Sequence, residues 1–112
     1  MTFFRISELE AVEMLPGIER SAVWLEGVML TFFVFQPNTN VPEHAHENEQ
    51  ITLVTQGALE FTLEGETRIL RAGEGVCIPP NAVHSARSLD ELTRAMDAWN
   101  PVREDYKGPQ GS

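Results

Sequence analysis

The sequence predicts an all-β protein with a single domain, folded as an antiparallel barrel or sandwich. Short runs rich in β-branched and aromatic residues follow one another along the chain, and Gly or Pro interrupts them at regular intervals. The length of 112 residues fits one compact domain, and the hydrophobic fraction of 42% supplies apolar material for one core. We therefore expect one domain over residues 1–112, with a flexible tail from about residue 105.

The expected elements are separated by recognisable turn residues. Gly65 can adopt the positive φ that a tight hairpin turn after residue 63 requires. Residues 79 and 80 are both Pro, which cannot continue an interior ladder, so a strand should end before them. Residues 7–15 are the one helical candidate, with the spacing of a capping box, although a short turn fits them equally; residues 37–42 are expected to be a loop. The expected strands span residues 21–25, 28–36, 51–56, 58–63, 67–71, 76–78, 82–87 and 92–99.

The composition limits the classes of partner. A net charge of −9 argues against nucleic-acid backbones and anionic membrane surfaces. A small anionic substrate remains possible, because a metal ion and one or two arginines can reverse the field locally. Cys77 is the single cysteine and no signal peptide is visible, so we expect a cytoplasmic protein. The longest apolar run, residues 28–35, is too short to cross a bilayer as a helix.

Three histidines form the main indication of chemistry. His44 and His46 are two residues apart, so on an extended segment they project from the same face. His84 lies far along the chain after a turn, and an antiparallel barrel could bring it opposite the first pair. Neutral imidazoles suit transition metals better than Ca²⁺ or Mg²⁺. From this spacing alone, three unrelated surface histidines are an equally good interpretation, because HxH pairs are common.

The surroundings of the histidines resemble the two motifs of the cupin family, G-x5-HxH-x3-E-x6-G and G-x5-P-x-G-x2-H-x3-N. In the first, the His44 to His46 pair is followed by Gln50 and, after six residues, by Gly57. In the second, Gly73 is followed by Pro79 and then His84, and the spacing between the motifs is that of small family members. This resemblance implies a cupin-type double-stranded β-helix, or jelly-roll, barrel. It also implies one divalent metal bound by His44, His46, Gln50 and His84.

The departures from these motifs have physical consequences. Asn38 and Asn81 stand where glycines are expected, and Asn is the next-best residue for positive φ, so both turns can survive. Gln50 replaces the usual glutamate, which leaves the metal with its full positive charge and favours an anionic ligand. Glu49 is the rival ligand, but neighbouring side chains on a strand face opposite ways, and the spacing to Gly57 favours Gln50.

A second group of candidate residues lies near the C-terminus. On a strand, Asp97 and Trp99 share one face, and we expect this face to point inward, because a metal or an arginine could compensate the charge of Asp97. The alternative is that both face solvent while Met96 packs in the core. The segment from Asp97 to Tyr106 is similar to the D-x-F-x-P-x-R-E-D-F ending of the KdgF family of pectin and alginate degradation. That resemblance implies roles in chemistry for Asp97, Trp99 and Arg103, with Trp99 replacing a phenylalanine.

The KdgF resemblance implies an enzyme that converts a 4,5-unsaturated monouronate into its linear keto sugar acid. A divalent transition metal, Zn, Ni, Mn or Fe, would polarise sugar oxygens, and Arg103 would hold the carboxylate. Asp97 would carry a proton during ring opening, and Trp99 would stack on the sugar. Two alternatives remain: another metal-cupin enzyme of the dioxygenase or lyase type, or a sugar-binding cupin without turnover.

The sequence also predicts a homodimer. The apolar segment at residues 3–6 could pair with a neighbouring subunit, since small barrels have sheet edges to protect. Both faces of residues 30–35 are apolar, which indicates that one face covers a partner subunit.

Overall fold

The computed structural model describes residues 3–107, which form ten strands and two 3-10 turns, η1 (Ile6–Glu8) and η2 (Glu104–Tyr106). All pairings between neighbouring strands are antiparallel. The all-β class is therefore confirmed. The strands are β1 (Val12–Leu15), β2 (Ile18–Trp24), β3 (Met29–Phe35), β4 (Asn40–His44), β5 (Glu49–Gln56), β6 (Ala58–Leu63), β7 (Glu66–Arg71), β8 (Gly75–Ile78), β9 (His84–Ser88) and β10 (Thr93–Asn100).

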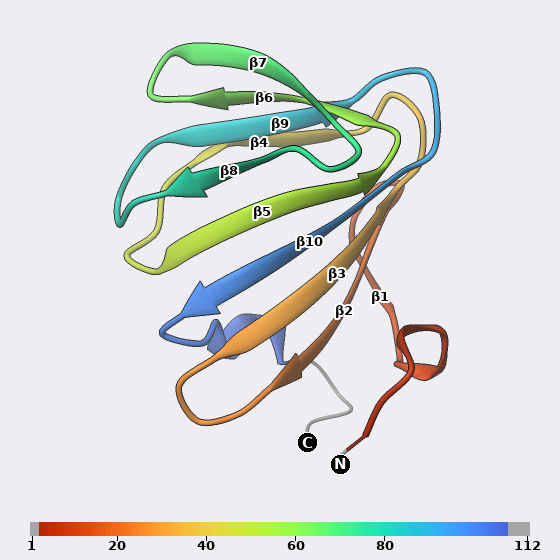
Figure 1. Ribbon diagram of the computed structural model, residues 1–112, viewed down its shortest axis with the longest axis vertical. Coiled ribbons are helices and arrows are strands. Elements are labelled where there is room, and N and C mark those ends of the chain that lie inside the picture. The colour runs from red at the N-terminus through yellow and green to blue at the C-terminus, as the bar shows by residue number, and fades with distance from the viewer. Residues whose placement is uncertain (1–2, 108–112) are drawn as a thin grey trace.

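The strands form two sheets that enclose the core between them (Figure 1). The first has six strands in the order β1-β2-β3-β10-β5-β8, and the second has four in the order β4-β9-β6-β7. Strands distant in sequence lie side by side, since β10 pairs with both β3 and β5 and β9 pairs with both β4 and β6. This arrangement is the jelly-roll barrel that the sequence predicts.

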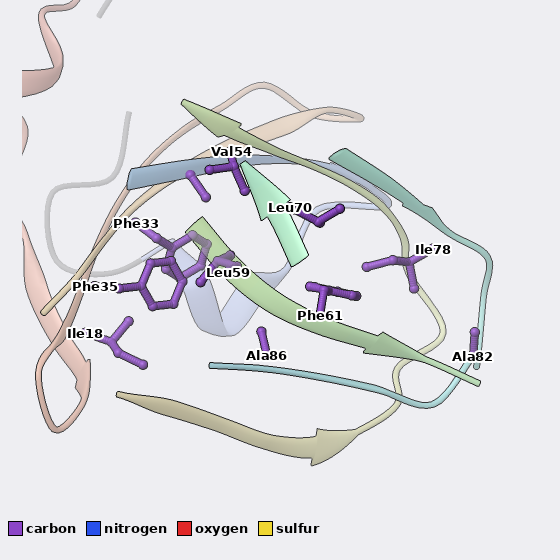
Figure 2. Packing of buried hydrophobic residues seen from close by; sticks show 11 residues of the cluster. Ile18, Phe33, Phe35, Val54, Leu59, Phe61, Leu70, Ile78, Ala82 and Ala86 are labelled. Carbon is purple, nitrogen blue, oxygen red and sulfur yellow. The ribbon is translucent and has the colours of Figure 1, made fainter. Parts of the chain in front are cut away.

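The core follows from the alternation of side chains along each strand. On β3, Phe33 and Phe35 are buried inside the barrel, whereas Phe32 and Val34 are half-buried on its outer face. The four-stranded sheet contributes facing apolar side chains, among them Leu59 (Figure 2). This cluster fills one part of the barrel and leaves the polar residues described below at the other part. Its buried members are Ile18, Phe33, Phe35, Val54, Leu59, Phe61, Leu70, Ile78, Ala82, Ala86 and Ala95.

The structure decides between the two interpretations of residues 7–15 and corrects one loop. Residues 7–15 do not form a helix: the short turn is correct, since η1 is a single 3-10 turn without a side-chain cap, and β1 follows it because Val12 and Glu13 pair with β2. Residues 37–42 are not all loop, because β4 begins at Asn40. Pro42 hides this strand in the sequence, and the structure accommodates the proline where the register of β4 against β9 shifts between Val41 and His44.

The turns use the residues that the sequence analysis singled out. Asn38 and Asn81 have φ of 60° and 65°, so they occupy the left-handed region at the two positions where the cupin motifs have glycine. Glu64 and Gly65, at φ of 46° and 83°, form the hairpin turn between β6 and β7.

The chain ends lie outside the two sheets. The N-terminal segment carries Phe3, Phe4 and Ile6, all exposed, and the ring of Phe4 lies 6.0 Å from that of Phe32 on the outer face of β3. After β10, η2 folds back so that Tyr106 packs against the buried core. The expected flexible tail falls mainly on residues 108–112, which lie outside the described residues. Between residues 3 and 107, no helix has the length and apolar character needed to cross a membrane.

Candidate metal centre

The three histidines meet inside the barrel although they come from distant parts of the chain. His44 ends β4, His46 follows it in the turn before β5, and His84 begins β9, where its Cα pairs with that of His44. One ring nitrogen from each histidine lies within 4.8 Å of the other two. The ring centroids of His44 and His84 are 4.2 Å apart, and those of His46 and His84 are 4.9 Å apart.

Carbonyl oxygens of the main chain select the tautomer of each neutral imidazole. The Nδ1 of His44 lies 2.8 Å from the carbonyl oxygen of Pro42, that of His46 lies 3.1 Å from Asn48 O, and that of His84 lies 2.9 Å from Ala82 O. A carbonyl oxygen only accepts, so Nδ1 must be the donor in each neutral ring, and Nε2 keeps its lone pair. The Nε2 of His84 is buried and has no hydrogen-bond partner among residues 3–107.

The electrostatic environment favours the neutral forms of His46 and His84. Burial lowers the pKa of His46 and His84 below the ordinary value for histidine, although their hydrogen bonds with backbone carbonyls act in the opposite direction. The positive charge of Arg103 also lowers both pKa values. Neutral imidazole is the form that binds a transition metal.

Gln50 adds a fourth donor to this cluster. It is buried on β5, whereas its neighbour Glu49 is exposed on the opposite face. The Oε1 of Gln50 lies 2.9 Å from the Nε2 of His46. With Nδ1 of His46 as the donor, both of these atoms carry lone pairs, so a cation bound between them would be attracted to both. The donor set of three imidazole nitrogens and one amide oxygen fits a divalent transition metal.

Asp97 lies behind Gln50 on the inward face of β10. Its Oδ2 accepts a hydrogen bond of 3.0 Å from the Nε2 of Gln50, and its Oδ1 is buried without a hydrogen-bond partner in the described part of the chain. Burial raises the pKa of Asp97 to about 7, although hydrogen bonding with Thr52 and Gln50 acts in the opposite direction. A carboxyl with this pKa can both accept and release a proton near neutral pH.

Trp99 and Arg103 lie next to the histidines. Trp99 is buried, its Nε1 donates to the Oγ1 of Thr31 at 2.9 Å, and its ring centroid is 5.2 Å from that of His46. The guanidinium carbon of Arg103 lies 5.1 Å from the centroid of Trp99. Asp105 binds the Nε and Nη2 of Arg103 at 3.0 and 2.8 Å, which leaves Nη1, buried and unpaired within residues 3 to 107, as the free donor.

The site contains a cavity of about 50 Å³. Among the residues that line it are His44, His84, Gln50, Asp97 and Trp99. This volume holds a few water molecules, but it is far below the roughly 300 Å³ at which ligand pockets begin. Aliphatic and aromatic core side chains complete its walls.

Two lining residues escaped the sequence analysis. Tyr106 packs its ring edge-on against Trp99, with centroids 5.4 Å apart, and the guanidinium groups of Arg20 and Arg103 lie 4.4 and 4.2 Å from its centroid. Its place beside Arg103 in the C-terminal motif was a usable signal. A threonine does not by itself indicate a functional role, but the position of Thr52 two residues after Gln50 places it on the same inward face.

The fold and this donor set define a class of protein. A model of the cupin domain matches residues 31–96, which include both histidine motifs, so the chain belongs to the cupin family.

Within that family, the similarity to KdgF extends over nearly the whole chain. The pectin degradation protein KdgF of Dickeya dadantii (strain 3937) is 30% identical over 106 residues, which cover 93% of this chain and 96% of that protein. The structure of KdgF from Halomonas sp. superposes with a TM-score of 0.88 at 33% identity, over 94% of this chain and 97% of that one. The H2HPP isomerase of Bacillus subtilis is 45% identical over 77 residues, 66% of this chain but 33% of that protein.

Proposed function

We propose that this protein is a metal-dependent enzyme that opens 4,5-unsaturated monouronates to linear keto sugar acids. The observation that carries the proposal is that Asp97 and Trp99 line a cavity next to the three converging histidines, while the guanidinium of Arg103 lies against the ring of Trp99. The similarity to KdgF along nearly the whole chain supports the same reaction.

The metal would be held by His44, His46, His84 and Gln50. When bound, a Zn, Ni, Mn or Fe ion would supply a Lewis acid that polarises sugar oxygens. The ligand set is neutral, so it would not offset the charge of the ion, and an anionic substrate would be favoured.

The reaction is an isomerisation and needs no oxidant. The hydroxyl on C1 loses a proton as the bond between C1 and the ring oxygen breaks, which forms an aldehyde and an enol; a proton then reaches C4 and the enol becomes a ketone. Asp97 would carry these protons through its unpaired Oδ1, which lies inside the barrel. The name of the Bacillus subtilis isomerase is consistent with redox-neutral chemistry on this barrel.

The substrate would be oriented by Arg103 and Trp99. The Nη1 of Arg103 would donate to the uronate carboxylate, while Asp105 keeps the other edge of the guanidinium occupied. Trp99 would offer a flat apolar wall to the sugar ring. Because the cavity is smaller than such a ring, we expect the segment that carries Arg103 and Tyr106 to move outward when the substrate enters.

The decisive experiment measures metal content and then turnover. Purified protein is analysed for metal, reloaded separately with Zn, Ni, Mn and Fe, and incubated with unsaturated galacturonate while the absorbance of the C=C bond is followed. We expect the absorbance to fall with at least one metal and to stay constant in the double variant His46→Ala, His84→Ala, which should hold little metal. Metal at full occupancy in that variant would contradict the site.

Other outcomes would favour the alternatives. Tight binding of the sugar acid without product, with every metal, would favour a sugar-binding cupin. Consumption of dioxygen with Fe and none with Zn would favour a dioxygenase. The cytoplasmic location stays a prediction.

A further inference from the structure

The side-chain amide of Gln50 has two chemically different ends, and only one of them can bind a cation. Its carbonyl oxygen Oε1 has lone pairs, whereas its nitrogen Nε2 carries two hydrogens and none available for a metal. A glutamine in this position is therefore a metal ligand only in one of the two orientations that differ by a flip of the amide. Something in the protein must select that orientation.

Two buried acceptors lie on the nitrogen side of the amide. Nε2 donates to the Oγ1 of Thr52 at 2.9 Å and to the Oδ2 of Asp97 at 3.0 Å. Both of its hydrogens are thereby used, and Oε1 is directed towards the Nε2 of His46, 2.9 Å away. Thr52 and Asp97 are themselves buried, so these bonds are shielded from bulk solvent.

The strand register holds both acceptors in place. Thr52 follows Gln50 by two residues on β5 and therefore shares its inward face. Asp97 lies directly opposite Thr52 on β10. Flipping the amide would direct Oε1 at the carboxyl of Asp97, whose ionised form repels it inside a barrel where burial weakens screening. The flip would also turn the hydrogens of Nε2 towards the histidines, so Gln50 would no longer offer a lone pair to a cation there.

We infer that Thr52 is a positioning residue which, together with Asp97, fixes the Gln50 amide with Oε1 towards the three histidines. Its hydroxyl is hydrogen-bonded to Gln50 and to Asp97, so it would act on the metal site through these two side chains. This role rests on the metal site of the proposed function, and it deepens that proposal by naming what makes the neutral fourth ligand competent.

The test uses Co²⁺ as the probe, because its d–d absorption reports the donor atoms around the ion. Thr52→Val removes the hydroxyl and keeps the branched shape of the side chain. We expect the Co²⁺ affinity of this variant to fall about 10-fold or more, as is usual when the partner of a metal ligand is removed, and the d–d bands to change. Thr52→Ser restores the hydroxyl and should bind Co²⁺ as the unmodified protein does.

Thr93→Val is the matched control. Thr93 is equally buried and its hydroxyl is also hydrogen-bonded, but to the backbone of Ala58 and not to any residue of the histidine cluster. This variant loses the same atom from the interior of the barrel, so it measures the general cost of the substitution. Its Co²⁺ affinity and spectrum should stay unchanged.

The outcomes separate the two proposals. If Thr52→Val matches the unmodified protein in affinity and spectrum, Thr52 does not position Gln50, and the metal site stands. If the unmodified protein binds no Co²⁺, the metal site fails and the role of Thr52 fails with it. A second measurement needs no variant: in Zn²⁺-loaded protein both hydrogens of the Gln50 side-chain amide should resist exchange with solvent, and rapid exchange of either would overturn the inference.

Discussion

Asp97 places its two oxygens in different surroundings. Oδ2 holds the Gln50 amide, and Oδ1 has no partner among the described residues, so one carboxyl serves both the shape of the site and its proposed chemistry. These two roles predict different effects of substitution. Loss of proton transfer should appear in turnover, whereas loss of the buried charge should appear in stability.

The stability of the metal-free protein should depend on Asp97 through pH. Its pKa of about 7 in the folded chain lies above the value of about 3.9 for an unfolded aspartate, so folding disfavours the ionised form. The destabilisation is absent below about pH 4, grows by up to about 1.4 kcal/mol per pH unit and is complete above about pH 7. Asp97→Asn should lack this dependence in chemical denaturation with excess chelator.

Asp90→Asn provides the control for that measurement, because Asp90 is exposed. Its stability profile should run parallel to that of the unmodified protein across the whole range. Parallel profiles for Asp97→Asn as well would show that the buried carboxyl is not the source of the pH dependence. With metal restored, Asp97→Asn should fold but lose turnover, because an amide cannot exchange the proton.

Arg103 should discriminate between charged and neutral sugars. Its free donor, Nη1, lies beside Trp99 and the histidines, so a carboxylate bound there gains a charge-assisted hydrogen bond. Arg103→Ala is expected to weaken uronate binding at least about 10-fold, corresponding to about 1.5 kcal/mol or more for such a bond, and to leave neutral sugars nearly unaffected. Calorimetric titration with both sugar types measures the difference.

Arg94→Ala removes the same charge from the outer face of the same strand, where Arg94 is exposed. Uronate affinity should not respond to it beyond the small effect of net charge. Equal losses in the two arginine variants would contradict a direct contact between Arg103 and the carboxylate.

At the scale of elements, the positions of the strands were more predictable than their pairing. Residues 51–56 and 58–63 were expected as strands, and β5 and β6 match them closely. β-Branched residues dominate the first run, and apolar and polar residues alternate in the second. β4 was missed because Pro42 disguises a strand that is stabilised by its pairing with β9. Local propensity does not contain this information, since the partner lies some 40 residues away.

Within the candidate site, too, some residues are predictable from the sequence and others are not. The histidines and Gln50 follow a motif with fixed spacing, so the sequence identifies them. Thr52 acquires its role from lying opposite Asp97 on β10, and Tyr106 from the fold of η2 back onto the barrel. Both contacts depend on tertiary structure, and neither residue type indicates chemistry by itself.

The turn between β5 and β6 provides a test of the backbone. Gly57 has a φ of +79°, and a Cβ there would meet the Oγ1 of Thr93 at 2.4 Å and the carbonyl oxygen of Leu92 at 2.6 Å. Gly57→Ala should therefore cost about 1–2 kcal/mol for the left-handed backbone and about 1–3 kcal/mol more for the clash. Denaturant unfolding measures the sum.

Gly73 separates the two contributions. Its φ of +88° is equally unusual for an L-residue, but a Cβ there meets nothing within 4 Å. Gly73→Ala should show only the backbone cost of about 1–2 kcal/mol. A loss as large as that of Gly57→Ala would mean that crowding against β10 is unimportant.

At the scale of the whole molecule, the outer face of the six-stranded sheet is unusually apolar. Leu30, Phe32 and Val34 are half-buried there on β3, and Ile51 on β5 is 55% exposed. β10 lies between these two strands, and its half-buried Met96 and Ala98 continue the apolar surface from β3 to β5. Such a surface favours association with another of the same kind. The homodimer expected from the sequence remains our prediction, and this face is the one we expect it to use.

Light scattering at micromolar concentration tests the assembly. The unmodified protein should have twice the mass of one chain, and Ile51→Glu should shift it towards the monomer by placing a charge in the interface. Ile69→Glu is the control, since Ile69 is 45% exposed on β7 in the other sheet and should leave the dimer intact. A monomer mass for the unmodified protein would refute the prediction.

The four candidate ligands are oriented by two different kinds of hydrogen-bond acceptor. The histidines are oriented by carbonyl oxygens of the main chain at Pro42, Asn48 and Ala82, which no side-chain substitution deletes. Gln50 is oriented by two side chains, and either can be lost through a single codon change. Descendants of such a gene can therefore keep the three imidazoles while the charge and donor strength of the fourth ligand change. New reactivity in this barrel should arise most readily by substitutions at Gln50 or at the side chains that orient it.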